Sequence, residues 1–210
     1  MKRVATRFPA FPLVAVLAAC GGASEEMADS SMEGEAQTPE AAVEAAGLDC
    51  FLMGASPTEA QQRISPHSRL AFIYDGHAGL LCYGAPSARE REVMGSLVPY
   101  NGQPWRIGAD EPTTIHLSAA ASVGGVQLEP GSYSLYAIPA EGDWDFFINT
   151  NYERWGIPIN EDVRESEIGS FTLAPQTMDS FVETLRYTWD DGAIVMEWEN
   201  TRFRIPVEGM

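Results

Sequence analysis

The sequence predicts an all-β protein: an antiparallel β-sandwich or barrel-like domain with one short N-terminal helix. Apolar and polar side chains alternate with a period of two through most of residues 69–207, which is the pattern of strands that bury one face. Turn signals rich in Gly, Pro and Asp separate about eight to ten short strands. The pattern lacks the repeated helices of about ten or more residues that a βαβ fold needs.

The first strands are expected in residues 69–84 and 113–139. Residues 69–84 contain a strand, a turn that begins at Asp75, and a second strand. Residues 113–139 contain three further short segments. Gly124 and Gly125 separate two of these segments as a two-residue hairpin turn, because both positions tolerate positive φ.

The remaining strands are expected to form hairpins. Residues 133–139 pair with residues 144–149, and residues 171–175 make another short strand. Residues 183–189 and 193–200 flank the sequence Asp-Asp-Gly, which is a strong hairpin signal.

The side-chain phase changes within the last of these strands. Apolar residues first occupy even positions and then odd ones: Ile194, Met196 and Trp198, followed by Phe203, Ile205 and Val207. A strand cannot change the face that it buries without an extra residue, because its side-chain period is two. We therefore expect a bulge or bend near Asn200 and a final strand that ends at Pro206.

One clear helix start precedes the strands. Residues 56–59, SPTE, offer a serine cap at Ser56, a proline at the first helical position, and Glu59 three residues after the cap. The helix is expected to be short and to end before Ile64. Helix and strands together predict one domain over residues 48–210, about 160 residues, which is enough for a substantial core.

Residues 1–19 have the layout of an export signal. Basic residues without an acid precede an apolar stretch that is too short to span a bilayer. The sequence LAAC, which ends at Cys20, resembles the lipobox of bacterial lipoprotein signals; an ordinary secretory peptide is the alternative. The resemblance implies that lipid on Cys20 anchors the protein to a membrane. Because Gly21 is not aspartate, it also implies the periplasmic side of the outer membrane.

Residues 20–47 are expected to form an acidic, disordered tether. They are rich in Gly, Ser, Ala and Glu, a composition that buries too little apolar surface to offset the entropy of ordering. Without the three basic residues of the leader, 10 of the 13 Lys and Arg remain against 30 Asp and Glu, a formal net charge of −20. This charge argues against a nucleic-acid partner.

Two cysteines lie in the predicted domain, Cys50 and Cys82. Outside the cytoplasm they can form a disulfide, which would add about 3–4 kcal/mol of stability in the chain-entropy model. The alternative is two separate buried thiols. We expect no metal on this pair and no cofactor.

Two motifs in the domain are specific. The pattern W-R-x-G-A-[ND]-E-x-T-T is filled from Trp105 to Thr114, and P-G-x-Y-x-L-x-x-I-P is filled from Pro130 to Pro139. These blocks resemble a bacterial family of secreted proteins, the domain-of-unknown-function family twenty-nine-eleven. The resemblance covers about residues 65–208, and it implies a family without implying an activity.

The chain departs from this family's pattern in the loop after residue 83. Where the family has Y-x-R-P, this chain has Ala85 in place of the arginine, and where the family has G-R it has Glu90 before Arg91. If the missing arginine contacts a ligand in the family, Arg89 and Arg91 are the nearby residues that can replace it.

The segment from Trp105 to Glu111 is the main candidate site, and three interpretations of it are open. It can be a structural corner in which Trp105 covers the core and Arg106 ties down the loop. It can be a ligand site of Arg106, Asp110 and Glu111, together with Arg89 and Arg91, because arginine pairs well with oxyanions. It can also be a hydrolase-like site that uses Asp110 and Glu111 as a carboxylate pair.

Other residues give weaker signals. No histidine lies in a metal-binding pattern, and His116 is expected to be exposed on the polar face of its strand. No nucleophile motif occurs. Trp105, Tyr152 and Trp155 suit a carbohydrate-binding surface. We therefore expect a lipid-anchored module that binds a small molecule or glycan or has a structural role in the envelope, rather than an enzyme.

Overall fold

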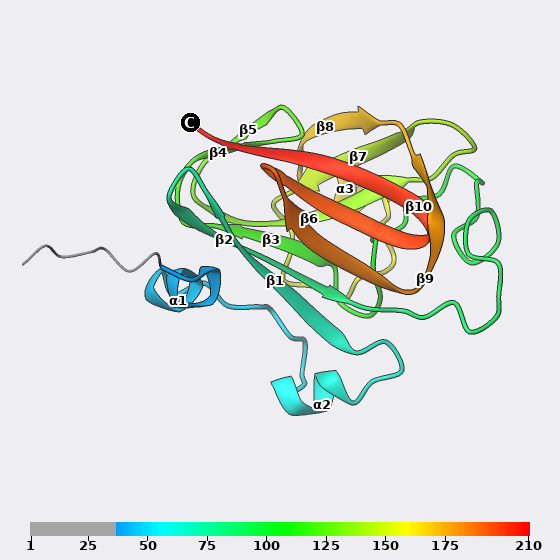
Figure 1. The fold of residues 1–210 in the computed structure, drawn as a ribbon, viewed down its shortest axis with the longest axis horizontal. Helices are drawn as coiled ribbons and strands as arrows, with labels where there is room; N and C mark the ends of the chain where they lie inside the picture. Colours follow the sequence, from blue (N-terminus) through cyan, green and yellow to red (C-terminus); the bar gives the residue numbers. More distant parts are fainter. Residues whose placement is uncertain (1–36) are drawn as a thin grey trace, which may run out of the picture. The chain divides into compact units, whose positions relative to one another are not determined.

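The computed structural model describes residues 37–210, which fold into two antiparallel β-sheets (Figure 1). The first sheet has six strands in the order β1 (His67–Tyr74), β2 (His77–Gly84), β3 (Thr113–Leu117), β6 (Gly131–Ile138), β7 (Trp144–Asn149) and β8 (Glu167–Leu173). The second has four strands in the order β5 (Val126–Leu128), β4 (Ala121–Val123), β10 (Ala193–Gly209) and β9 (Gln176–Asp190). The expected all-β sandwich is confirmed.

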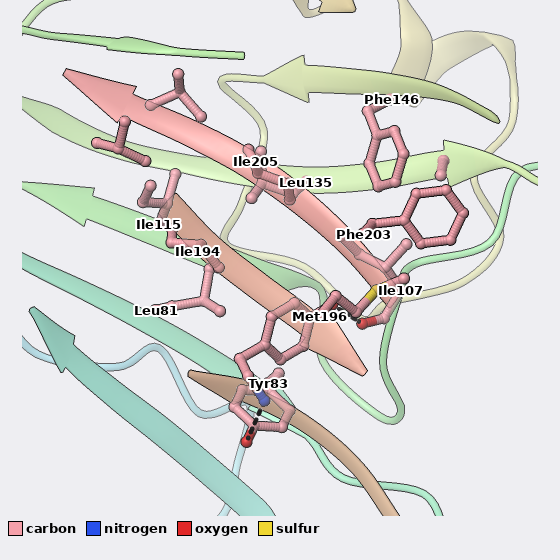
Figure 2. Close-up of a cluster of buried hydrophobic side chains, with 14 of the residues drawn as sticks. Leu81, Tyr83, Ile107, Ile115, Leu135, Phe146, Ile194, Met196, Phe203 and Ile205 are labelled. Atoms are coloured by element: carbon pink, nitrogen blue, oxygen red, sulfur yellow. Dashed lines mark hydrogen bonds between the residues drawn. The ribbon is translucent and has the colours of Figure 1, made fainter. Parts of the chain in front are cut away.

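The core lies between the two sheets. Alternating apolar residues of the first sheet face those of β10, as Figure 2 shows. The labelled strand residues in this cluster are Leu81, Tyr83, Ile115, Leu135, Phe146, Ile194, Met196, Phe203 and Ile205. Full burial of each such side chain stabilises the fold by about 1.5–3 kcal/mol, so the period-two pattern fixes which face of each strand points inward.

Strand β10 bends where its side-chain phase changes, as expected. The register against β9 shifts between Glu197 and Glu199 and again between Glu199 and Thr201, and Glu199 has a φ of 55°. The irregularity lets both Trp198 and Phe203 face the core. The strand continues to Gly209, however, so the expected end at Pro206 is wrong. Residues 207–209 pair with β4, and a proline at 206 removes only one donor from the ladder.

The structure contains three short helices within residues 37–210, where we expected one. The expected helix is α2 (Pro57–Gln61), whose capping box joins Ser56 and Glu59 in both directions. Helix α3 (Glu161–Arg164) begins after an asparagine cap and buries Val163 against the outer face of the first sheet. None of the helices described is long and apolar enough to cross a membrane.

Helix α1 (Pro39–Ala45) corrects the predicted boundary of the tether. Residues 37–47, expected to belong to the spacer, are part of the folded domain. Ala42 and Val43 are buried against Leu80 on the outer face of β2. The composition of residues 20–47, rich in Gly, Ser, Ala and Glu, did not reveal that these two apolar residues lie side by side and pack on the sheet. The leader at 1–19, Cys20 and the rest of the tether lie outside the described residues.

Cys50 and Cys82 form a disulfide, with 5.8 Å between their Cα atoms. Cys82 is buried in β2, and Cys50 packs in the same cluster as Leu80. The bond therefore fastens the segment between α1 and α2 to the outer face of the first sheet.

Candidate functional site

Trp105 is partly buried and packs against the core from the loop after β2. Its backbone pairs with Ala137 of β6 through two hydrogen bonds of 2.7 and 2.9 Å. Its ring lies edge-on to Trp144 and stacks on Trp198, with 6.0 Å between the ring centroids in each pair. For Trp105 the packing is therefore that of the structural corner, with the ring against two core tryptophans.

The backbone that follows Trp105 is held in an unusual shape. Ile107 has a φ of 45° and Asp110 a φ of 62°, which are costly for residues other than glycine, by about 1–3 kcal/mol each. The carbonyl of Ile107 accepts hydrogen bonds from the Thr113 hydroxyl at 3.1 Å and from the Tyr187 hydroxyl at 2.6 Å. Backbone strain of this kind is concentrated at functional sites in proteins, which marks this loop as a candidate site.

The backbone at Gly156 packs directly against the loop that contains Arg106 and Asp110. Its N–H donates to the carbonyl of Asp110 at 3.0 Å. A Cβ at this position would lie 2.3 Å from the Asp110 carbonyl oxygen and 2.5 Å from Cδ of Arg106. Glycine therefore allows the segment after β7 to lie directly on the Arg106 side chain.

Glu111 is a buried and fully engaged carboxylate. It is 3% exposed, accepts from the Met53 N–H at 3.0 Å, and forms an ion pair of 2.5 Å with Arg63. Burial raises the pKa of Glu111, but the hydrogen bond from Arg63, supported by backbone hydrogen bonds, outweighs it and leaves the pKa below its usual value. Glu111 thus anchors residues 53 and 63 to the loop, and it remains ionised at neutral pH.

Arg106 has no such partner. Its guanidinium group is partly buried, it forms no ion pair with any residue of 37–210, and its Nε is buried without a hydrogen-bond partner. Burial lowers the pKa of Arg106, and the charges of Asp110 and Glu111 oppose that shift. A buried donor that lacks an acceptor is destabilising by about 1–3 kcal/mol, and more when it is charged.

Arg154 is a second arginine of the site, which the sequence analysis missed. It donates to the carbonyls of Asn151 at 3.2 Å, Trp155 at 2.9 Å and Gly156 at 3.2 Å. Its remaining terminal nitrogen, Nη2, is buried without a partner. Burial lowers the pKa of Arg154, and the positive charge of Arg106 acts in the same direction. No sequence motif connects Arg154 to Arg106, because only the fold brings them together.

Arg89 and Arg91 do not join this site. The guanidinium of Arg89 donates to the carbonyl of Ile64 at 3.2 Å, and its backbone N–H donates to Glu183 at 2.7 Å. Arg91 donates to the carbonyls of Ala88 and Ser87 in its own loop, at 2.9 and 3.1 Å. Both residues are close to Arg106 in sequence, but neither joins it, because Ile64 holds the Arg89 side chain and the Arg91 side chain is held within its own loop.

The expected exposure of His116 is wrong. The side chain is 3% exposed, and its Nε2 and Nδ1 lie 2.9 and 2.7 Å from the hydroxyls of Thr114 and Ser132. Tyr152, which itself packs edge-on to Phe51, covers the imidazole with 6.1 Å between the rings. The polar face of this strand is covered by other segments of the chain, which strand alternation alone does not reveal. Burial lowers the pKa of His116 to about 4.

The free energy of unfolding is therefore expected to fall as the pH drops from 6.5 to 4.5. In this range the unfolded chain protonates residue 116 and the folded chain does not, so protons favour unfolding; with a folded pKa of about 4 the loss from His116 is about 2.5 kcal/mol by pH 4.5. The pKa of His67 is also lowered by burial and adds to the slope.

Urea unfolding of the wild type and of His116→Gln across this range measures the effect. The variant should lose most of the slope. The lowered pKa values of Glu111 and Glu197 affect stability mainly below about pH 4.5, and they act equally on both proteins. Equal slopes in both proteins would contradict a buried, neutral imidazole.

Comparison with known proteins gives one match. A family model described as "Protein of unknown function (DUF2911)" matches residues 65–207, a range that contains the loop from Trp105 to Glu111 and also Arg154. No curated protein and no solved structure matches this chain.

Proposed function

This chain belongs to the DUF2911 family, whose description assigns no activity, and from its own residues we propose that it is a ligand-binding module of the bacterial envelope. In this proposal the β-sandwich lies outside the cytoplasm, lipid on Cys20 holds it to the outer membrane, and the ligand binds where Arg106 meets Gly156.

The proposal depends chiefly on the state of Arg106. Nε of this partly buried guanidinium is a buried donor without an acceptor. Such a donor has a cost in stability, and natural proteins retain such a cost where a binding partner supplies the missing contact. The positive φ at Ile107 and Asp110, on either side of Gly108, is a second local cost in stability in the same loop. Both costs are understandable if the loop is shaped for a ligand rather than for stability alone.

The environment outside the cytoplasm is supported by the disulfide. A bond between Cys50 and Cys82 persists in oxidising compartments and is rare in the cytosol. It agrees with the lipobox-like sequence before residue 20. Labelling of cells with a palmitate analogue tests the anchor, because incorporation that continues in Cys20→Ala would rule it out.

Binding is favoured over hydrolysis by the state of Glu111. A carboxylate pair that works as acid and base needs one member with a raised pKa and room for a substrate. Both oxygens of Glu111 are instead engaged by Arg63 and Met53, and its pKa is lowered. This side chain therefore suits a structural anchor beside the ligand rather than a proton donor.

A thermal-shift screen of the purified protein against envelope metabolites, glycans and divalent ions is expected to identify ligands that depend on Arg106. At a ligand concentration about a hundredfold above Kd, stabilisation is about 2.7 kcal/mol, or a rise in Tm of roughly 5–11 °C for a domain of this size. The rise should be lost in Arg106→Gln.

The matched control is Arg91→Gln, which removes an exposed guanidinium that contacts only its own loop. This variant should respond to ligands as the wild type does. Ligands that stabilise all three proteins equally would place the binding site elsewhere and refute the proposal.

A further inference from the structure

We propose that the ligand carries an oxyanion, a phosphate or carboxylate group, which Arg106 and Arg154 bind together. This inference rests on the function proposed above and specifies the chemistry of the same site.

The two arginines meet at one residue. Arg154 donates from Nη1 to the carbonyl of Gly156 at 3.2 Å. A Cβ on Gly156 would lie only 2.5 Å from Cδ of Arg106, so the Arg106 side chain runs against the same backbone. The loop after β2 supplies Arg106, and the segment after β7 supplies Arg154. The hydrogen bond from the Gly156 N–H to the Asp110 carbonyl holds these two segments together.

Both guanidinium groups have a donor that the protein leaves unbonded. Within residues 37–210, the only buried side-chain nitrogen or oxygen atoms without a hydrogen-bond partner are Nε of Arg106 and Nη2 of Arg154. Every other buried polar side-chain atom of that region has a hydrogen-bond partner, so missing hydrogen bonds are specific to these two arginines. A guanidinium has donors and no acceptor, and the partner that it lacks must supply acceptor lone pairs.

The balance of charge indicates that this partner is negative. Glu111 is neutralised by Arg63, and neither Arg106 nor Arg154 forms an ion pair with another residue of the described part of the chain. Of the carboxylates whose charge acts on Arg106, only Asp110 is left to offset two guanidinium groups. This is a local excess of positive charge in a chain with a formal net charge of −17. A neutral acceptor would satisfy the N–H groups and leave the two cations repelling each other, whereas an oxyanion satisfies both requirements.

The site is also preorganised. Three hydrogen bonds to neighbouring carbonyls hold the Arg154 side chain in one position, so little conformational entropy is lost when a ligand binds. The rest of the acidic surface is screened beyond about 8 Å at physiological ionic strength, and the partly buried guanidinium groups are screened much less.

Titration of the purified full chain with sodium phosphate, and separately with sodium acetate, tests the inference. Sodium chloride of matched ionic strength is the blank. At about ten times Kd, one of the two anions should raise the Tm by roughly 3–6 °C above the blank. The more effective anion identifies the group that the ligand carries. The Nε–H signal of Arg106 in the NMR spectrum of ¹⁵N-labelled protein should shift during the same titration.

Arg106→Gln is the main test, because within residues 37–210 this side chain makes no ion pair whose loss would unfold the protein. It should weaken the affinity for the anion about tenfold or more, since a hydrogen bond to a charged group contributes more than a neutral one. Arg154→Gln should do the same, and Arg106→Lys should recover only part of the loss. Arg91→Gln should bind as the wild type does.

The outcomes separate this inference from the function on which it rests. One outcome is that neither anion changes the Tm beyond the chloride blank, while a neutral compound from the screen stabilises the wild type but not Arg106→Gln. The inference of an oxyanion ligand is then wrong, and the proposed binding function remains. If no compound of any charge depends on Arg106, both are wrong. Equal stabilisation of the wild type and both arginine-to-glutamine variants would indicate a general salt effect and would overturn the oxyanion site.

Discussion

Replacing both Cys50 and Cys82 by alanine is expected to lower the free energy of unfolding by about 3.5–4 kcal/mol, the loop-closure entropy for a sequence separation of 32 residues. For a domain of this size, the Tm should fall by roughly 7–16 °C. The loss should extend to the candidate site, because the segment that Cys50 fastens to β2 also carries Met53, whose N–H binds Glu111.

Thermal unfolding with and without dithiothreitol measures this effect. The reductant should lower the Tm of the wild type towards that of the variant, and it should leave the variant itself unchanged. A wild type that is as stable reduced as oxidised would show that the cross-link contributes nothing to folding.

Trp105→Ala is expected to destabilise the protein by about 3–4 kcal/mol, towards the lower end for the loss of a large aromatic side chain because its ring is only partly buried. The variant loses the contacts with Trp144 and Trp198 and leaves space in the core beside them. Urea unfolding monitored by far-UV circular dichroism gives the value.

Trp155→Ala is the matched control for Trp105. The Trp155 side chain is 40% exposed, and the guanidinium of Arg63 lies 5.8 Å from its ring centroid. Its removal should change the free energy of unfolding by no more than about 0.5 kcal/mol. If Trp155→Ala lowered the free energy of unfolding more than Trp105→Ala does, the packing of Trp105 against the core would be contradicted.

Local signals in the sequence predicted the strands and turns well. The two glycines at 124 and 125 connect β4 to β5, and the capping box at Ser56 begins α2. The change of side-chain phase near Asn200 located the irregularity in β10. Each of these features depends on residues within a few positions of one another, so the local sequence is enough to predict it.

The candidate site could be predicted only in part, because its contacts are long-range. The motif at 105–114 indicated an important loop, and it did not show that Trp105 points into the core while Arg106 lies against Gly156. Glu111 is held by residues 53 and 63, which nothing in the sequence links to it. His116 lies on a polar strand face that another segment covers, and period-two alternation cannot distinguish a covered polar face from an exposed one.

The position of β10 in the chain has a consequence for how the protein reaches its folded state. This strand comes after every other strand, yet it pairs with both β4 and β9 and supplies many of the residues that cover the inner face of the six-stranded sheet. A polypeptide that emerges N-terminus first therefore has all of that sheet available while its apolar side is still bare. Such late, long-range strand pairing is slow and prone to aggregation. The four-stranded sheet can form only once β10 has emerged, so until then the growing polypeptide carries an uncovered apolar sheet that favours aggregation.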